Sequence, residues 1–196
     1  MNTIYQIVIE GFENPPQFVE VWKSKYSYLN EEKYFQNIDS VFDNETSFFQ
    51  LFKWKNGTGD VIYEKKMKVV EGFYEKLDVL KQLRSNFNWK QFENEFQPTK
   101  NSPIWKIFLL HLIKPTEFPI FDQHVYRFYY FQKEGVIEEL SNRPEIIYET
   151  YKQEYKPWFN SVQREFQLNS KHMDQSFFSF GKVLKSLKEL PIKITY

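Results

Sequence analysis

Hydrophobic residues recur at helical spacing along most of the chain. Apolar side chains three or four positions apart alternate with polar stretches from residue 15 to residue 190, a periodicity typical of amphipathic helices. Helices are predicted over residues 15–26, 31–42, 46–55, 60–86, 103–113, 123–132, 144–159 and 174–190. Only residues 4–9 and the last residues are strand-like. The pattern therefore predicts an all-α fold with at most a short strand at either end.

Helix start and stop signals support these boundaries. Asn56-Gly57 is a typical left-handed helix stop, and Ser102-Pro103 reads as an N-cap followed by a first helical residue. The helix after Pro103 is apolar on all sides, so we expect it to be buried. Asp122 and Asp174 are both predicted to cap the helices that follow them.

Composition excludes several classes of function. The 196 residues contain no Cys and three scattered His, which excludes disulfides, iron–sulfur clusters and Cys-ligated zinc, and no metal or cofactor is expected. The longest apolar run, Ile104–Ile113, is shorter than the roughly 20 residues that a membrane helix needs. The N-terminus lacks the pattern of a secretory signal. These features predict a cytoplasmic protein without a membrane anchor.

Charge is balanced overall but unevenly distributed. Residues 1–50 hold three Lys against eight Asp and Glu, so the remainder carries the compensating positive charge. Residues 98–116 contain three Lys and no acid, and residues 171–196 contain five Lys against two acids. These two basic stretches have two interpretations, a surface for nucleic-acid phosphates or ordinary solvated helix faces. The acidic N-terminal part is a candidate surface for a protein partner.

Two short segments carry a resemblance to a known family. The sequence FPIFDQHVYRF, at residues 118–128, resembles the Pro-x-Ile-x-Val-Asp-Thr-His-Val-x-Arg segment of the helix-hairpin-helix DNA glycosylase superfamily, with Gln123 in place of Thr. As in that family, it follows an apolar helix and a short loop. The later sequence FFSFGKVLK, at residues 177–185, is similar to a segment of divergent bacterial members of the superfamily.

The resemblance implies a single glycosylase-like domain over residues 1–196, built from two interleaved helical lobes. It implies that Asp122 faces a base extruded from DNA, where a carboxylate activates water or stabilises the positive charge that develops on the sugar. The DNA contacts that we expect come from basic residues near this segment and in the two basic stretches, namely His124, Arg127, Lys100, Lys182 and Lys185. The expected partner is therefore DNA.

Two departures from the family limit this chemistry. The family's glycine-rich phosphate-gripping hairpin should lie about twenty residues before Asp122, where this chain has TKNSPIW and no glycine. The family's Schiff-base lysine corresponds to Ile104, and Lys106 lies two residues further on. At about 100° per residue, that displacement turns a side chain to nearly the opposite helix face. A monofunctional glycosylase acting through Asp122 is therefore favoured, with Lys106 as the alternative catalytic group.

Structural roles remain open for the same residues. Helix capping explains the presence of Asp122 equally well. His124 has a structural role if it donates a hydrogen bond to a nearby carbonyl, and Arg127 has one if it forms a buried ion pair. His111, in the apolar helix, is expected to be a hydrogen-bonded core residue. Lys182, Lys185 and Lys188 recur at helical spacing and predict one basic face. The alternative functions are a non-catalytic DNA-binding protein or a protein-interaction module of the same fold.

Overall fold

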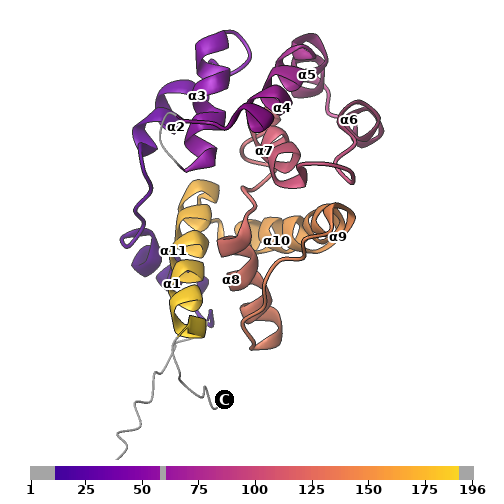
Figure 1. The fold of residues 1–196 in the computed structure, drawn as a ribbon. Coiled ribbons are helices and arrows are strands. Elements are labelled where there is room, and N and C mark those ends of the chain that lie inside the picture. The colour runs from indigo at the N-terminus through magenta and orange to yellow at the C-terminus, as the bar shows by residue number, and fades with distance from the viewer. Residues whose placement is uncertain (1–11, 58–60, 190–196) are drawn as a thin grey trace, which may run out of the picture. The chain divides into compact units, whose positions relative to one another are not determined.

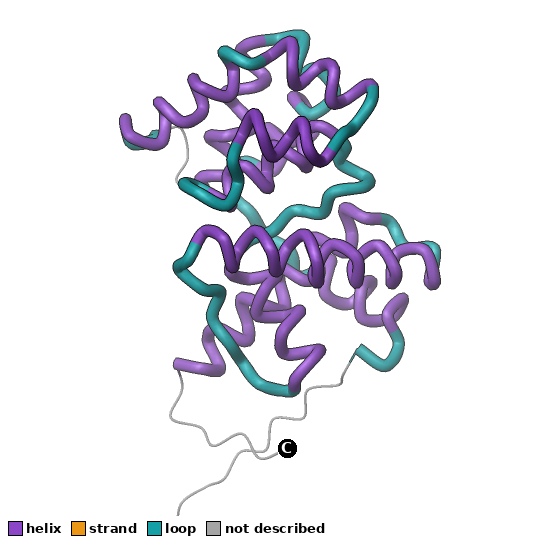
Figure 2. The backbone as a smooth tube through the Cα atoms, turned by 90° about the vertical axis from the view of Figure 1, so that its right-hand side faces the viewer, coloured by secondary structure: helices purple, strands orange, loops and turns teal. Residues whose placement is uncertain are grey.

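The computed structural model describes residues 12–57 and 61–189, and within these ranges the backbone consists of helices and loops only (Figures 1 and 2). The all-α prediction is therefore confirmed. The strand-like residues 4–9 lie outside the described residues, as do the last residues of the chain. None of the described helices is long and apolar enough to cross a membrane.

The chain divides into two compact units, each made of separated stretches of sequence. Within the described ranges, unit 1 comprises residues 12–26, 122–140 and 157–189, and unit 2 comprises residues 27–57, 61–121 and 141–156. The chain thus leaves unit 1 after its first helix, forms most of unit 2, and re-enters unit 1 at Asp122.

Unit 1 is built around the longest helix of the described chain. Its helices are α1 (Pro15–Lys23), α8 (Gln123–Glu134), most of α10 (Lys156–Phe166) and α11 (Ser170–Glu189). Both α1 and α8 pack against α11, and four aromatic rings form the centre of this packing: Phe18, Phe128, Phe177 and Phe180. The buried hydroxyl of Ser176 donates to the carbonyl of Val19 at 2.9 Å, so a small polar residue joins α1 to α11.

Unit 2 surrounds the apolar helix that the sequence predicted. Its elements are α2 (Glu31–Asn37), α3 (Glu45–Asn56), α4 (Glu64–Tyr74), α5 (Leu77–Ser85), α6 (Trp89–Phe96), α7 (Pro103–Ile113), α9 (Pro144–Glu149) and the π-helical segment η1 (Thr150–Tyr155). Residues 106–113 of α7 are all buried, which confirms its predicted position in the core. Aromatic side chains supply much of the core volume, as in the contact between Phe52 and Trp105 with ring centroids 5.4 Å apart.

Several predicted helix boundaries are confirmed. Helix α3 stops at Gly57, which adopts the left-handed conformation with φ +70°, and α7 begins at Pro103. Helix α3 begins at Glu45, one residue before the predicted range of 46–55, and Asn44 is its cap and accepts a hydrogen bond from the backbone N of Ser47.

Two predictions about helices were wrong, and one helix was missed. The single helix predicted over residues 60–86 is two helices, α4 and α5, because the backbone hydrogen-bond ladder is interrupted at Lys76. The Nζ of Lys76 donates to the backbone carbonyl and to the carboxylate of Glu95. Helix α6 was not predicted at all. Asp174 is not a cap, since α11 begins four residues earlier and Asn169 accepts the capping hydrogen bond from the backbone N of His172.

Candidate functional site

The candidate site lies at the N-terminus of α8 in unit 1. Asp122 precedes the helix, and its Oδ1 accepts hydrogen bonds from the backbone N of His124 at 2.8 Å and of Val125 at 3.2 Å. The capping prediction for Asp122 is therefore confirmed. Two N–H donors and the positive end of the helix dipole favour negative charge at this position and fix the direction of the carboxylate.

His124 lies in the first turn of α8 and is half-buried. Its Nδ1 lies 3.1 Å from Nη1 of Arg127, and its ring makes a T-shaped contact with the Phe178 ring, with centroids 4.9 Å apart. Burial is the main cause that lowers the pKa of His124, and the charges of Arg127 and Lys182 lower it further. The charge of Asp122 and a backbone hydrogen bond with Gly181 oppose this shift. The environment as a whole favours the neutral imidazole.

Arg127 forms an ion pair in which the arginine is buried and the carboxylate partly exposed, so the buried pair that one interpretation of the sequence predicted is confirmed for the arginine only. The residue is 5% exposed, and its Nε and Nη2 donate to the two carboxylate oxygens of Glu139 at 2.9 and 2.8 Å. These hydrogen bonds are the main reason that the pKa of Glu139 lies below its ordinary value. Lys188 adds a longer contact to Glu139 at 3.4 Å. The guanidinium is thus anchored inside unit 1.

Gly181 allows α11 to approach the start of α8. A Cβ atom at this position would lie 1.9 Å from the backbone carbonyl oxygen of His124, a distance that atoms cannot adopt. The two segments that carry the family resemblance, about fifty residues apart in sequence, therefore meet at this glycine. Sequence reasoning did not assign Gly181 a role, although a lone glycine inside a helical pattern signals close backbone approach.

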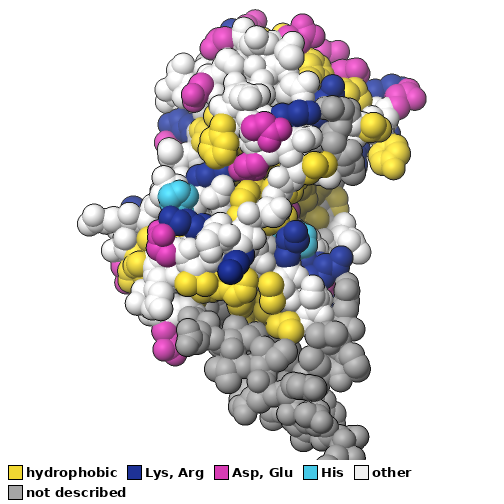
Figure 3. All heavy atoms as spheres, turned by 90° about the vertical axis from the view of Figure 1, so that its left-hand side faces the viewer, with side chains coloured by type: hydrophobic (Ala, Val, Ile, Leu, Met, Phe, Trp, Pro, Cys, Tyr) yellow, Lys and Arg dark blue, Asp and Glu magenta, His cyan; other side chains and the backbone are white. Residues whose placement is uncertain are grey.

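The predicted basic face of α11 is present in part. Lys182 and Lys185 are exposed, and the Nζ of Lys182 lies 5.7 Å from the centroid of the Phe178 ring. Lys188 instead turns toward Glu139. Basic side chains lie beside hydrophobic ones on the surface in Figure 3. Lys182 lies close enough to His124 for its charge to affect that residue's pKa, which joins the basic face to the candidate site.

The two other predicted site residues, Lys106 and Lys100, belong to unit 2. Lys106 is 9% exposed and its Nζ donates to the carbonyl of Gln97 at 3.0 Å. Burial is the main cause that lowers the pKa of Lys106, and the nearby charge of Lys100 adds to the effect. Lys100 is exposed in the loop between α6 and α7. The amine of Lys106 therefore stabilises the end of α6 rather than pointing into solvent.

The loop between α6 and α7 stands where the family's glycine-rich hairpin is expected. It joins two helices through six residues, and its first and last residues, Gln97 and Ser102, adopt φ values of +45° and +52°. Glycine ordinarily fills such left-handed positions because side chains strain them. This helix–loop–helix was not predicted from the sequence because its loop contains no glycine and α6 was missed.

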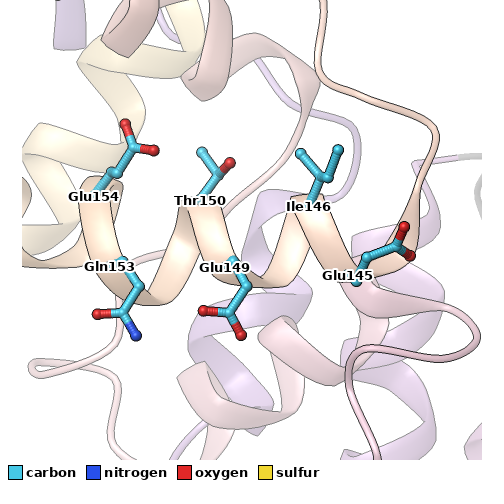
Figure 4. Close-up of a pocket in the computed structure, with 6 residues that line it drawn as sticks. All are labelled: Glu145, Ile146, Glu149, Thr150, Gln153 and Glu154. Atoms are coloured by element: carbon cyan, nitrogen blue, oxygen red, sulfur yellow. The ribbon is translucent and has the colours of Figure 1, made fainter.

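A surface pocket of about 420 Å³ lies elsewhere, in unit 2. All the residues that line it belong to α9 and η1 (Figure 4). They are Glu145, Ile146, Glu149, Thr150, Gln153 and Glu154. None of the predicted site residues lines it. No group of three or more His, Asp or Glu side chains in the described ranges is placed to hold a metal ion.

Comparison of the chain with protein-family models, curated proteins and solved structures finds no match. The candidate site therefore rests on its residues and geometry.

Proposed function

We propose that this protein is a divergent, monofunctional DNA glycosylase-like enzyme in which Asp122 is the catalytic carboxylate. The observation that carries the proposal is the fixed carboxylate at the start of α8, hydrogen-bonded to two backbone N–H groups at the point where the chain re-enters unit 1. The resemblance implies two interleaved lobes, and the chain divides into two compact units, each made of separated stretches of sequence. Lys182 and Lys185, on the helix that packs against α8, supply positive charge for DNA phosphates.

The proposed reaction breaks the N-glycosidic bond between a base and C1′ of its deoxyribose. The departing base takes the bonding electron pair, positive charge develops on the sugar, and the oxygen of water bonds to C1′, while the proton that this water loses balances the one gained by the base. The Asp122 carboxylate stabilises the charge or takes the proton from water, and the product is an abasic site. A carboxylate held in one direction by backbone N–H groups requires little reorganisation during such a step.

Water is the proposed nucleophile because of the surroundings of Lys106. A Schiff base requires a free amine that can reach C1′ of the sugar. Lys106 lies in unit 2 and is 9% exposed as a residue, and its partly buried amine donates to the carbonyl of Gln97. That hydrogen bond supports a structural role for Lys106.

Single-turnover cleavage of end-labelled oligonucleotides with a panel of modified bases tests the proposal. We expect the wild-type protein to give strand breaks only after alkali treatment. We expect the rate for Asp122→Asn to be lower by about 100-fold or more. Asparagine is also a good N-cap, so this variant keeps the helix start and isolates the charge. Breaks without alkali would indicate an amine nucleophile, and equal rates in the two proteins would contradict the role of Asp122.

A second candidate function, non-catalytic DNA binding, is favoured by the exposure of Lys182 and Lys185 on α11. We expect the double variant Lys182→Gln/Lys185→Gln to weaken duplex binding and to reduce the slope of log affinity against log salt by about 2, because each phosphate contact contributes about 1. The matched control is Lys65→Gln/Lys68→Gln on α4 of unit 2. An unchanged slope in the α11 variant would exclude this face from DNA binding.

A further inference from the structure

The guanidinium of Arg127 is directed at two groups at once. Two of its nitrogens bind the carboxylate of Glu139, and the third, Nη1, lies 3.1 Å from Nδ1 of His124. A guanidinium only donates hydrogen bonds and does not lose its proton in proteins. Nδ1 of His124 must therefore accept, so the imidazole carries its proton on Nε2 and is neutral.

His124 in turn connects to Asp122 through its own backbone. The N–H of His124 donates to Asp122 Oδ1 at 2.8 Å, and its carbonyl lies against Gly181 of α11. The same residue therefore holds the carboxylate with its main chain while its side chain is held by Arg127. Any rotation of the first turn of α8 would break both sets of contacts together.

We propose that Arg127 is a positioning residue that, anchored by Glu139, fixes the Nε2–H tautomer of His124 and through it holds the Asp122 carboxylate at the start of α8. The expected effect of Arg127 on catalysis rests on the proposed function of Asp122. The tautomer of His124 and the geometry at the start of α8 do not depend on that function. His124 then acts as a link between α8 and α11, with its Nδ1 engaged by Arg127.

The charged groups around His124 agree with this arrangement. Asp122 and Arg127 face it from the α8 side, and Lys182 faces it from α11 together with the Gly181 backbone and the Phe178 ring. Protonation of Nδ1 would place an N–H donor against the Arg127 donor and a third positive charge near Lys182. Burial and these two cations lower the pKa of His124, which is the direction that the tautomer requires.

Nuclear magnetic resonance of the full-length chain, labelled with ¹⁵N in histidine, tests the tautomer directly. The His124 signals are assigned by their loss in His124→Asn. We expect the Nε2–H tautomer for His124 near neutral pH, with protonation only as pH falls below the ordinary histidine range. An Nδ1–H tautomer, or an average of the two forms, would overturn the proposal.

The variant Arg127→Met removes the donor and keeps a long apolar side chain, and Arg164→Met on the exposed face of α10 is its matched control. In Arg127→Met we expect a tautomer average, a higher pKa of His124, and amide hydrogen exchange at His124 and Val125 about tenfold faster. Arg164→Met should leave all three unchanged. If Arg127→Met does not fold, Glu139→Gln keeps Arg127 and weakens only its anchor, and smaller changes in the same direction are expected.

Single-turnover assays separate this inference from the proposed function. If the wild-type protein removes a base, Arg127→Met should lower the rate at saturating DNA while the dissociation constant for DNA stays the same. An altered tautomer with an unchanged rate would overturn the link between Arg127 and Asp122. If the wild-type protein removes no base, the proposed function fails, and the tautomer and exchange results still decide whether Arg127 positions His124 and the helix start.

Discussion

Replacing Gly181 with alanine is expected to destabilise unit 1 by about 3 kcal/mol or more, at the upper end of what overpacking costs. The added Cβ would lie 1.9 Å from the carbonyl oxygen of His124, 2.6 Å from its carbonyl carbon and 3.0 Å from its Cα. These are backbone atoms of α8, which cannot move aside as a flexible side chain could. Helix α11 must therefore shift away from α8, and the contacts of Phe177 and Phe180 with Phe128 must loosen with it. Chemical denaturation followed by circular dichroism measures the loss.

Gly72 provides the matched control. It also lies inside a helix, α4, but a Cβ there would meet nothing within 4 Å. Alanine has the higher helix propensity, so Gly72→Ala is expected to stabilise the protein by roughly 0.5–1 kcal/mol. The two substitutions are identical in chemistry and should have opposite signs. Equal effects at both positions would mean that α8 and α11 do not approach each other as closely as Gly181 indicates.

Replacing His111 with leucine is expected to cost about 3 kcal/mol of unfolding free energy, from two lost buried hydrogen bonds. His111 is 2% exposed in α7 of unit 2, with Nδ1 2.8 Å from the carbonyl of Phe118 and Nε2 2.8 Å from the hydroxyl of Tyr34. A carbonyl only accepts, so Nδ1 carries the proton and Nε2 accepts from the tyrosine. Leucine is similar in volume but offers neither a donor nor an acceptor. The imidazole thus joins α2, α7 and the loop before α8.

Two further variants separate the contributions. Tyr34→Phe removes one hydroxyl and should cost about 1 kcal/mol, less than the loss of His111. His172→Leu, at a half-buried position near the start of α11, should change stability by less than about 0.5 kcal/mol. An effect of His111→Leu no larger than that of His172→Leu would show that the core of unit 2 does not depend on this imidazole.

Local signals accounted for several helix ends. The left-handed stop at Gly57, the start of α7 at Pro103 and the cap at Asp122 each follow from the backbone preferences or side-chain chemistry of one or two residues. The burial of α7 follows from its lack of a polar face. The internal hydrogen bonds of His111 were also predictable, because an imidazole in an apolar helix needs polar partners.

Other features were not predicted from the sequence, and one of them depends on residues far apart in the chain. The break between α4 and α5 falls at a lysine, Lys76, and no proline or glycine marks it. It coincides with the contact between the Lys76 side chain and Glu95 of α6. The short helix α6 was missed although its signals are local, with a cap in Asn88 and buried Phe92 and Phe96 one turn apart. Asp174 resembles a cap in sequence and lies inside α11, 5% exposed.

By itself the sequence determined the all-α class, the buried α7 and the helix start at Asp122, because hydrophobic periodicity and capping act over a few neighbouring residues. Only the tertiary structure decided that the helix start at Asp122 packs on Gly181, that Arg127 divides its guanidinium between Glu139 and His124, and that Lys106 is turned to the carbonyl of Gln97. Each of these depends on which helices pack together. That choice is made by the burial of whole faces, and no short stretch of sequence contains it.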